Sequence, residues 1–142
     1  MKKILALLIT LFCFFGCSKQ DVPENNDIYY VKYEFSCQVV QYGKVYSTPY
    51  TITYVGSDLD EHSRDFKTGE KEEITCGPFK YGDRIKLSLE HFYHDNVGGS
   101  SQANVVLDVF VSKNNSPFSL QKTESSSSQE PHCTTLEYAI LY

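Results

Sequence analysis

The chain has 142 residues, of which 13 are basic and 18 acidic, and its formal net charge is −5. An acidic balance argues against a nucleic-acid partner, which needs a basic stripe, and against electrostatic adhesion to anionic lipid. Eleven tyrosines, nine phenylalanines and no tryptophan, with frequent Val, Ile and Thr, are typical of β-strands, so we expect little helix.

The first 16 residues have the pattern of a secretion signal. Two lysines follow Met1, and Ile4 to Phe15 is an uncharged, mostly apolar run. This run is too short for a membrane-spanning helix, which needs about 20 apolar residues. We therefore expect residues 1–16 to be a signal peptide. Cleavage of this segment would remove two lysines and no acidic residue, so the formal net charge of the remaining chain would be −7.

Gly16-Cys17 resembles the end of a bacterial lipobox, in which a small residue precedes the cysteine that is acylated. Phe14 and Phe15 are bulkier than is usual at their places in this motif. We expect lipidation of Cys17, with cleavage after Ser18 and no lipid as the alternative. Two or more acyl chains, at about 0.8 kcal/mol per buried methylene, would anchor the chain stably in a membrane.

Residues 17–27 are polar and aperiodic, which predicts a flexible tether. From residue 28 to residue 142, apolar side chains recur at every second position in short segments with turn residues between them. The segments are 29–39, 45–55, 72–79, 85–94, 105–111, 118–122 and 136–142. This pattern predicts one all-β domain, an antiparallel immunoglobulin-like or transthyretin-like sandwich of seven to eight strands.

The inward-facing positions of these segments define the expected core. They are Val31, Tyr33, Phe35, Ile52, Tyr54, Ile85, Leu87, Leu89, Val105, Leu107, Val109, Leu136, Tyr138 and Ile140. We expect three long loops to present binding groups, namely residues 56–71, with a short strand near Phe66, and residues 95–102 and 125–131.

The strand segments succeed one another in a recognisable order: Tyr30-x-x-Tyr33-Glu34-Phe35, Tyr50-Thr51-Ile52-Thr53-Tyr54, Tyr81-Gly82-Asp83-Arg84-Ile85-Lys86-Leu87-Ser88, Val105-x-Leu107-x-Val109-x-Val111 and Leu136-Glu137-Tyr138. In this succession, most of residues 28–142 resembles the small single-domain β-sandwich lipoproteins of gut Bacteroidetes. It is more distantly similar to the mycobacterial MmpS accessory proteins. The resemblance implies an immunoglobulin-like or transthyretin-like sandwich and brings no catalytic residues with it.

The densest group of metal-ligand types contains His91 and His94. Residues three apart on a strand point to opposite faces, so these two side chains share a metal only if the strand ends between them. A solvated strand end is the simpler interpretation, and His132 is a further histidine without a required spacing. Asp58, Asp60 and Glu61 offer oxygen ligands for calcium but lack the EF-hand pattern, which favours a solvated acidic loop.

Three cysteines remain beyond Cys17. Cys37 and Cys76 share the apolar parity of their strands, so we expect a Cys37–Cys76 disulfide, whereas Cys133 has the opposite parity. Such a bridge would stabilise the fold by about 4 kcal/mol in the chain-entropy model. Buried, unpaired thiols are the alternative.

Tyrosines at the surface could form an aromatic platform for a ligand. The candidates are Tyr30, Tyr46, Tyr50 and Tyr93, from a larger pool that includes Tyr29, Tyr42 and Tyr142. The same side chains also suit cross-strand packing.

The sequence contains no nucleophile elbow, phosphate-binding loop, zinc-protease motif or paired CxxC, so we expect no enzyme and no cofactor. The preferred hypothesis is an outer-membrane lipoprotein of the cell envelope that binds a protein or glycan without catalysis. The alternative is a structural or accessory subunit of an envelope membrane assembly, docked by strand addition.

Overall fold

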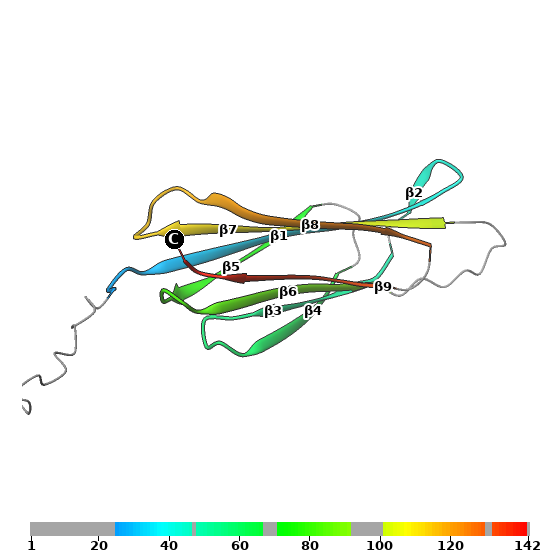
Figure 1. Cartoon of the computed structure of the whole chain (residues 1–142). Helices are drawn as coiled ribbons and strands as arrows, with labels where there is room; N and C mark the ends of the chain where they lie inside the picture. The colour runs from blue at the N-terminus through cyan, green and yellow to red at the C-terminus, as the bar shows by residue number, and fades with distance from the viewer. Residues whose placement is uncertain (1–24, 47, 67–70, 92–100, 130–131, 142) are drawn as a thin grey trace, which may run out of the picture.

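The computed structural model describes residues 25–46, 48–66, 71–91, 101–129 and 132–141. These residues form nine β-strands and no helix. The strands make two antiparallel sheets that pack face to face (Figure 1). The predicted all-β antiparallel sandwich is therefore confirmed.

Sheet A is built on two long strands, β1 (Tyr29–Gln41) and β7 (Ser101–Lys113). On the outer side of β7 lies β8 (Ser119–Ser128), and the other side of β1 is shared by β2 (Lys44–Tyr46) and β5 (Glu72–Phe79). Sheet B has the order β4-β3-β6-β9. Its strands are β3 (Tyr50–Val55), β4 (Glu61–Phe66), β6 (Arg84–His91) and β9 (His132–Ala139).

The core lies between the sheets, where the alternating apolar side chains of β1, β7, β3 and β6 meet. Twelve of the fourteen predicted core residues are buried, and the other two, Tyr54 and Tyr138, pack against the core while partly exposed. The pairing of β1 with β7 runs without a break from Tyr29 opposite Lys113 to Gln41 opposite Ser101. Period-two alternation on paired strands places the alternating apolar side chains on one face, which is why the core was predictable.

Two segments that we expected to be loops belong to strands. The structure has nine strands rather than seven or eight because residues 61–66 form β4 and the expected segment 45–55 is divided into β2 and β3. Residues 61–66, expected as a loop with a short strand near Phe66, form the edge strand β4. The Phe66 ring lies 5.0 Å from that of Phe35 and is stacked at 5.7 Å on Tyr50. This aromatic anchor holds an otherwise polar strand against the sheet.

The serine-rich segment at residues 125–128 is the second one that differs from the prediction. Residues 125–128 continue β8, with Ser125 opposite Val106 and Ser128 opposite Ala103. Hydroxyl contacts such as Ser126 Oγ to Thr134 Oγ1, at 2.5 Å, link this edge to sheet B. Backbone pairing with β7 therefore overrides the composition of the segment. Ser101 and Gln102, also expected in a loop, begin β7, while residues 95–100 lie outside the described ranges.

The sandwich has two ends, which we name by the start of β1. At the N-terminal end lie the beginning of β1, the end of β9 and the turns β3–β4, β5–β6 and β7–β8 (Figure 1). At the far end lie the β1–β2 hairpin, the end of β6 and the beginning of β9.

Candidate functional site

The hairpin that joins β1 to β2 projects at the far end of the sandwich (Figure 1). Gln41 pairs with Lys44, so the turn has only two residues, Tyr42 and Gly43, with φ values of 49° and 72°. Two successive positive φ values are the geometry that matches the twist of a two-residue hairpin. The sequence thus builds a short, well-defined projection.

Three apolar or aromatic side chains of this hairpin are open to solvent. Tyr42 is 70% exposed, Val45 60% and Tyr46 43%. We call these three residues the hairpin surface. Tyrosine rings offer a large contact area at a low cost in side-chain entropy, and their hydroxyl groups keep one edge polar. Such a surface can stack on a sugar ring or fill a pocket of a partner protein.

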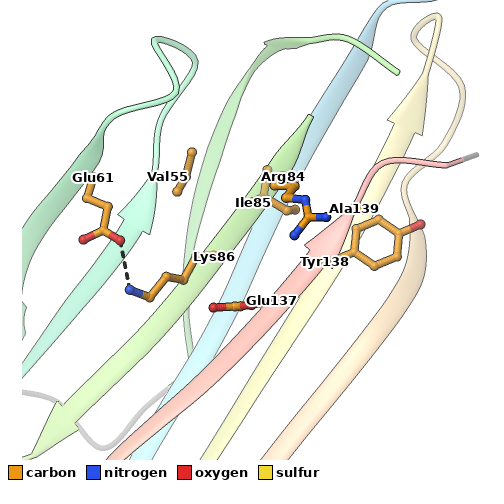
Figure 2. Close-up of a pocket in the computed structure, with 8 residues that line it drawn as sticks. All are labelled: Val55, Glu61, Arg84, Ile85, Lys86, Glu137, Tyr138 and Ala139. Carbon is orange, nitrogen blue, oxygen red and sulfur yellow. Dashed lines mark hydrogen bonds and ion pairs between the residues drawn. The ribbon is translucent and has the colours of Figure 1, made fainter. Parts of the chain in front are cut away.

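A second surface lies on the outer face of sheet B, near the N-terminal end. It is a depression of about 510 Å³. Figure 2 shows the eight residues that line it, which are Val55, Glu61, Arg84, Ile85, Lys86, Glu137, Tyr138 and Ala139.

Charged side chains dominate this depression. Lys86 Nζ lies 2.9 Å from Glu61 Oε1, and Glu137 is directly opposite Lys86 on the next strand (Figure 2). The hydrogen bond to Glu61 raises the pKa of Lys86 above its ordinary value. The Arg84 side chain makes no hydrogen bond or ion pair with any residue of the described ranges. Its guanidinium is therefore available for a carboxylate or phosphate group.

The structure does not bring the predicted tyrosines together. Tyr50 is 1% exposed, so its assignment to a binding surface is wrong; its ring packs against Phe35 and Phe66 in the core. Tyr30 is half-buried at the start of β1, where it borders a groove of about 300 Å³ together with Phe118. Tyr46 lies at the far end, and Tyr93 lies outside the described residues. A single aromatic platform from these four residues is therefore not formed.

The expected Cys37–Cys76 disulfide is wrong. Cys76 lies opposite Val31 on β1, six residues from Cys37, which corresponds to about 20 Å along the strand. A disulfide requires Cα atoms within about 7 Å. Both cysteines are free thiols, as is the exposed Cys133. Burial raises the pKa of Cys37 to about 11, as expected for a thiol that packs as a small hydrophobic group.

Asp58 and Asp60 of the acidic segment lie in the tight turn between β3 and β4, and Glu61 begins β4. Asp58 accepts hydrogen bonds from the Asp60 backbone N–H and from His62 Nε2, at 3.2 and 2.9 Å. These bonds hold the pKa of Asp58 below its ordinary value, the largest contribution coming from His62. The carboxylate of Asp58 therefore stabilises the β3–β4 turn through hydrogen bonds.

The two weak candidates for metal ligands, His91 and His94, do not lie together on a solvated strand end in the described structure. His91 is 2% exposed, so a solvated strand end does not describe it, and His94 lies outside the described residues. No group of three or more metal-ligating side chains occurs within the described ranges. Those ranges also contain no helix that is long and apolar enough to cross a membrane.

Sequence reasoning missed two features of these surfaces. Val45 is not among the predicted binding residues, and Tyr42 appears only in the larger pool of tyrosines, although a Tyr-Gly pair between alternating apolar residues is a hairpin signal. Arg84 was noted only as part of the Gly-Asp turn and strand. Comparison with family models, with curated proteins and with solved structures finds no match for this chain.

Proposed function

We propose that this protein is an outer-membrane lipoprotein of the cell envelope whose sandwich domain is a non-catalytic binding or adhesion module for a protein or glycan. The observation that supports the proposal is the hairpin surface, formed by Tyr42, Val45 and Tyr46 at the far end. Val45 and Tyr46 are consecutive in β2 and point to opposite faces, so the hairpin exposes apolar groups on both faces. Exposed apolar and aromatic side chains on a projecting hairpin are a common feature of recognition surfaces.

The position of the hairpin suits a tethered domain. A lipid on Cys17 and a tether of residues 17–27, at most about 40 Å when fully extended, lead to the N-terminal end. Exposed apolar side chains at that end include Ile28, Leu59, Tyr81 and Leu141. In this orientation they face the membrane, and the hairpin surface faces away from it.

The alternative, an accessory subunit docked by strand addition, finds less support in the edge strands β4 and β8. Every residue of the edge strand β4 except Phe66 is exposed, and the strand carries Glu61, Arg64 and Asp65. The edge strand β8 is rich in serine. Charged and polar edges oppose pairing with another strand.

The test compares three forms of the full-length protein expressed in its native cells. The first is the wild type, and the second replaces the hairpin surface by Tyr42→Asn, Val45→Thr and Tyr46→Thr, which keep turn and strand propensity. The third is Leu59→Asn, an exposed apolar residue at the N-terminal end whose φ of 65° resembles that of Tyr42. Partners are quantified by mass spectrometry after crosslinking intact cells, and purified proteins are compared on glycan arrays.

We expect the hairpin variant to lose its partner or glycan by about tenfold or more, because aromatic anchors carry much of the energy of an interface. The Leu59→Asn protein should retain it. Equal binding by all three forms would overturn the role of the hairpin. A partner recovered from the envelope assembly and lost on altering the β4 edge would favour the alternative. An unmodified mature chain that begins at Lys19 would remove the lipid anchor from the proposal.

A further inference from the structure

Two histidines face each other across sheet B at the far end. His91 is the last residue of β6, and His132 is the first residue of β9. They are directly opposite in the antiparallel register. Side chains that are directly opposite lie on the same face of a sheet, with Cβ atoms about 4.5–5.5 Å apart. Two residues 41 positions apart in the sequence are therefore neighbours on one face of the sheet.

The hydrogen bonding of this pair is incomplete. His91 is 2% exposed, yet neither Nδ1 nor Nε2 has a hydrogen-bond partner within the described structure. His132 is exposed and has no hydrogen bond to a described residue. A buried polar side chain with no partner is uncommon in native proteins, and it often marks a place where water or an ion binds.

The chemistry of the two side chains suits coordination. Neutral imidazole is a good ligand for zinc and copper, with metal–nitrogen distances of about 2.0–2.1 Å for zinc.

We infer that His91 and His132 form a two-histidine binding site for a borderline divalent transition-metal ion, such as Zn²⁺ or Cu²⁺. The buried ring fixes one ligand, and the exposed ring at the start of β9 gives the ion a route from solvent. Cys133 and Glu90 are paired on the opposite face of the sheet and do not contribute ligands. With no third side chain of this kind among the described residues, the other coordination positions are open to water. Ca²⁺ and Mg²⁺, which prefer oxygen ligands, should not bind there.

The test uses the full chain, purified without a histidine tag. Cu²⁺ binding is followed by titration calorimetry and by electron paramagnetic resonance, which detects coordinated imidazole nitrogen. Thermal unfolding is recorded with Zn²⁺ and, for comparison, with Ca²⁺. The variant is His132→Gln, chosen because the side chain is exposed and its loss leaves the core intact. The control is His62→Gln, which removes an exposed histidine at the N-terminal end.

We expect the wild type and the His62→Gln protein to bind one Cu²⁺ through two nitrogens and to unfold at a higher temperature with Zn²⁺ but not with Ca²⁺. His132→Gln should fold normally, bind copper about tenfold more weakly or worse, and lose the second nitrogen signal. An unchanged affinity in His132→Gln, or no saturable binding by the wild type, would overturn the inference.

Discussion

The two ends of the sandwich are built differently. At the N-terminal end, the chain is locked by reciprocal hydrogen bonds: Asn114 N–H donates to the Ile28 carbonyl at 2.8 Å, and Ile28 N–H donates to Asn114 Oδ1 at 2.9 Å. In the same region Gly82 N–H donates to the Ile140 carbonyl, and Ile140 N–H donates to the Asp83 carbonyl. These bonds close the start of β1 and the end of β9 onto neighbouring turns.

The far end has exposed apolar side chains and a buried polar side chain without hydrogen bonds in the described part of the chain. Its hairpin exposes Tyr42, Val45 and Tyr46, and its buried His91 has two ring nitrogens without a hydrogen-bond partner among the described residues. Exposed apolar side chains and unpartnered buried polar groups cost stability. In natural proteins such departures concentrate where a chain binds something. The contrast is the reason for placing both proposed sites at the far end.

The largest expected effect comes from a glycine at the N-terminal end. Gly77 in β5 has a φ of 150°, and a Cβ there would lie 2.5 Å from Tyr30 Cδ1 and 3.1 Å from the Tyr29 carbonyl oxygen. Gly77→Ala should therefore reduce the free energy of unfolding by about 3 kcal/mol, through backbone strain and the steric clash. Urea denaturation followed by circular dichroism measures this change.

The matched control is at the far end. Gly43 also has a positive φ, of 72°, but no atom lies within 4 Å of a Cβ built there. Gly43→Ala should cost only about 1 kcal/mol, from backbone conformation alone. If the two variants lost the same stability, the tight closure that we describe for the N-terminal end would be wrong.

A smaller effect is expected within the β7–β8 turn. Asn114 and Asn115 both have positive φ values, so glycine fits either position without strain. Only Asn114 bonds across to the start of β1, through Ile28 N–H and Asp27 Oδ1. Asn114→Gly should reduce the free energy of unfolding by about 1–2 kcal/mol, whereas Asn115→Gly should be close to neutral. Equal losses in thermal unfolding would contradict the locked N-terminal end.

The smallest expected effect is on the pH dependence of the folding stability. The hydrogen bond from Lys113 is the main cause that lowers the pKa of Asp27 from its ordinary value of 3.8. A lowered folded-state pKa contributes stability that is present above pH 4 and is lost as the pH falls through the folded pKa. Asp27→Asn should therefore lower stability slightly above pH 5, leave it unchanged at a pH below the folded pKa, and so flatten the acid limb of the stability profile. An acid limb identical to that of the wild type would show that this ion pair contributes nothing.

Much of the fold could be predicted because alternation is a local property. Val31, Leu107 and Ile52 reveal their buried faces through their neighbours in sequence, and this information is enough to locate the strands and the core. Polar strands such as β4 and the serine-rich end of β8 carry no such signal. They form because a neighbouring strand offers hydrogen bonds, which no local pattern records.

The candidate sites were less predictable for the same reason. The sequence by itself determined that His91, Tyr50 and the cysteines lie on or beside strands, and it indicated their parity. The pairing and register of the strands became known only from the tertiary structure. The register places Cys76 about 20 Å along β1 from Cys37 and sets His132 opposite His91. The packing of the sheets buries Tyr50 against Phe66. Parity depends on adjacent residues, but register depends on the best packing of the whole sandwich, so the hairpin surface and the histidine pair become visible only once the sheets are assembled.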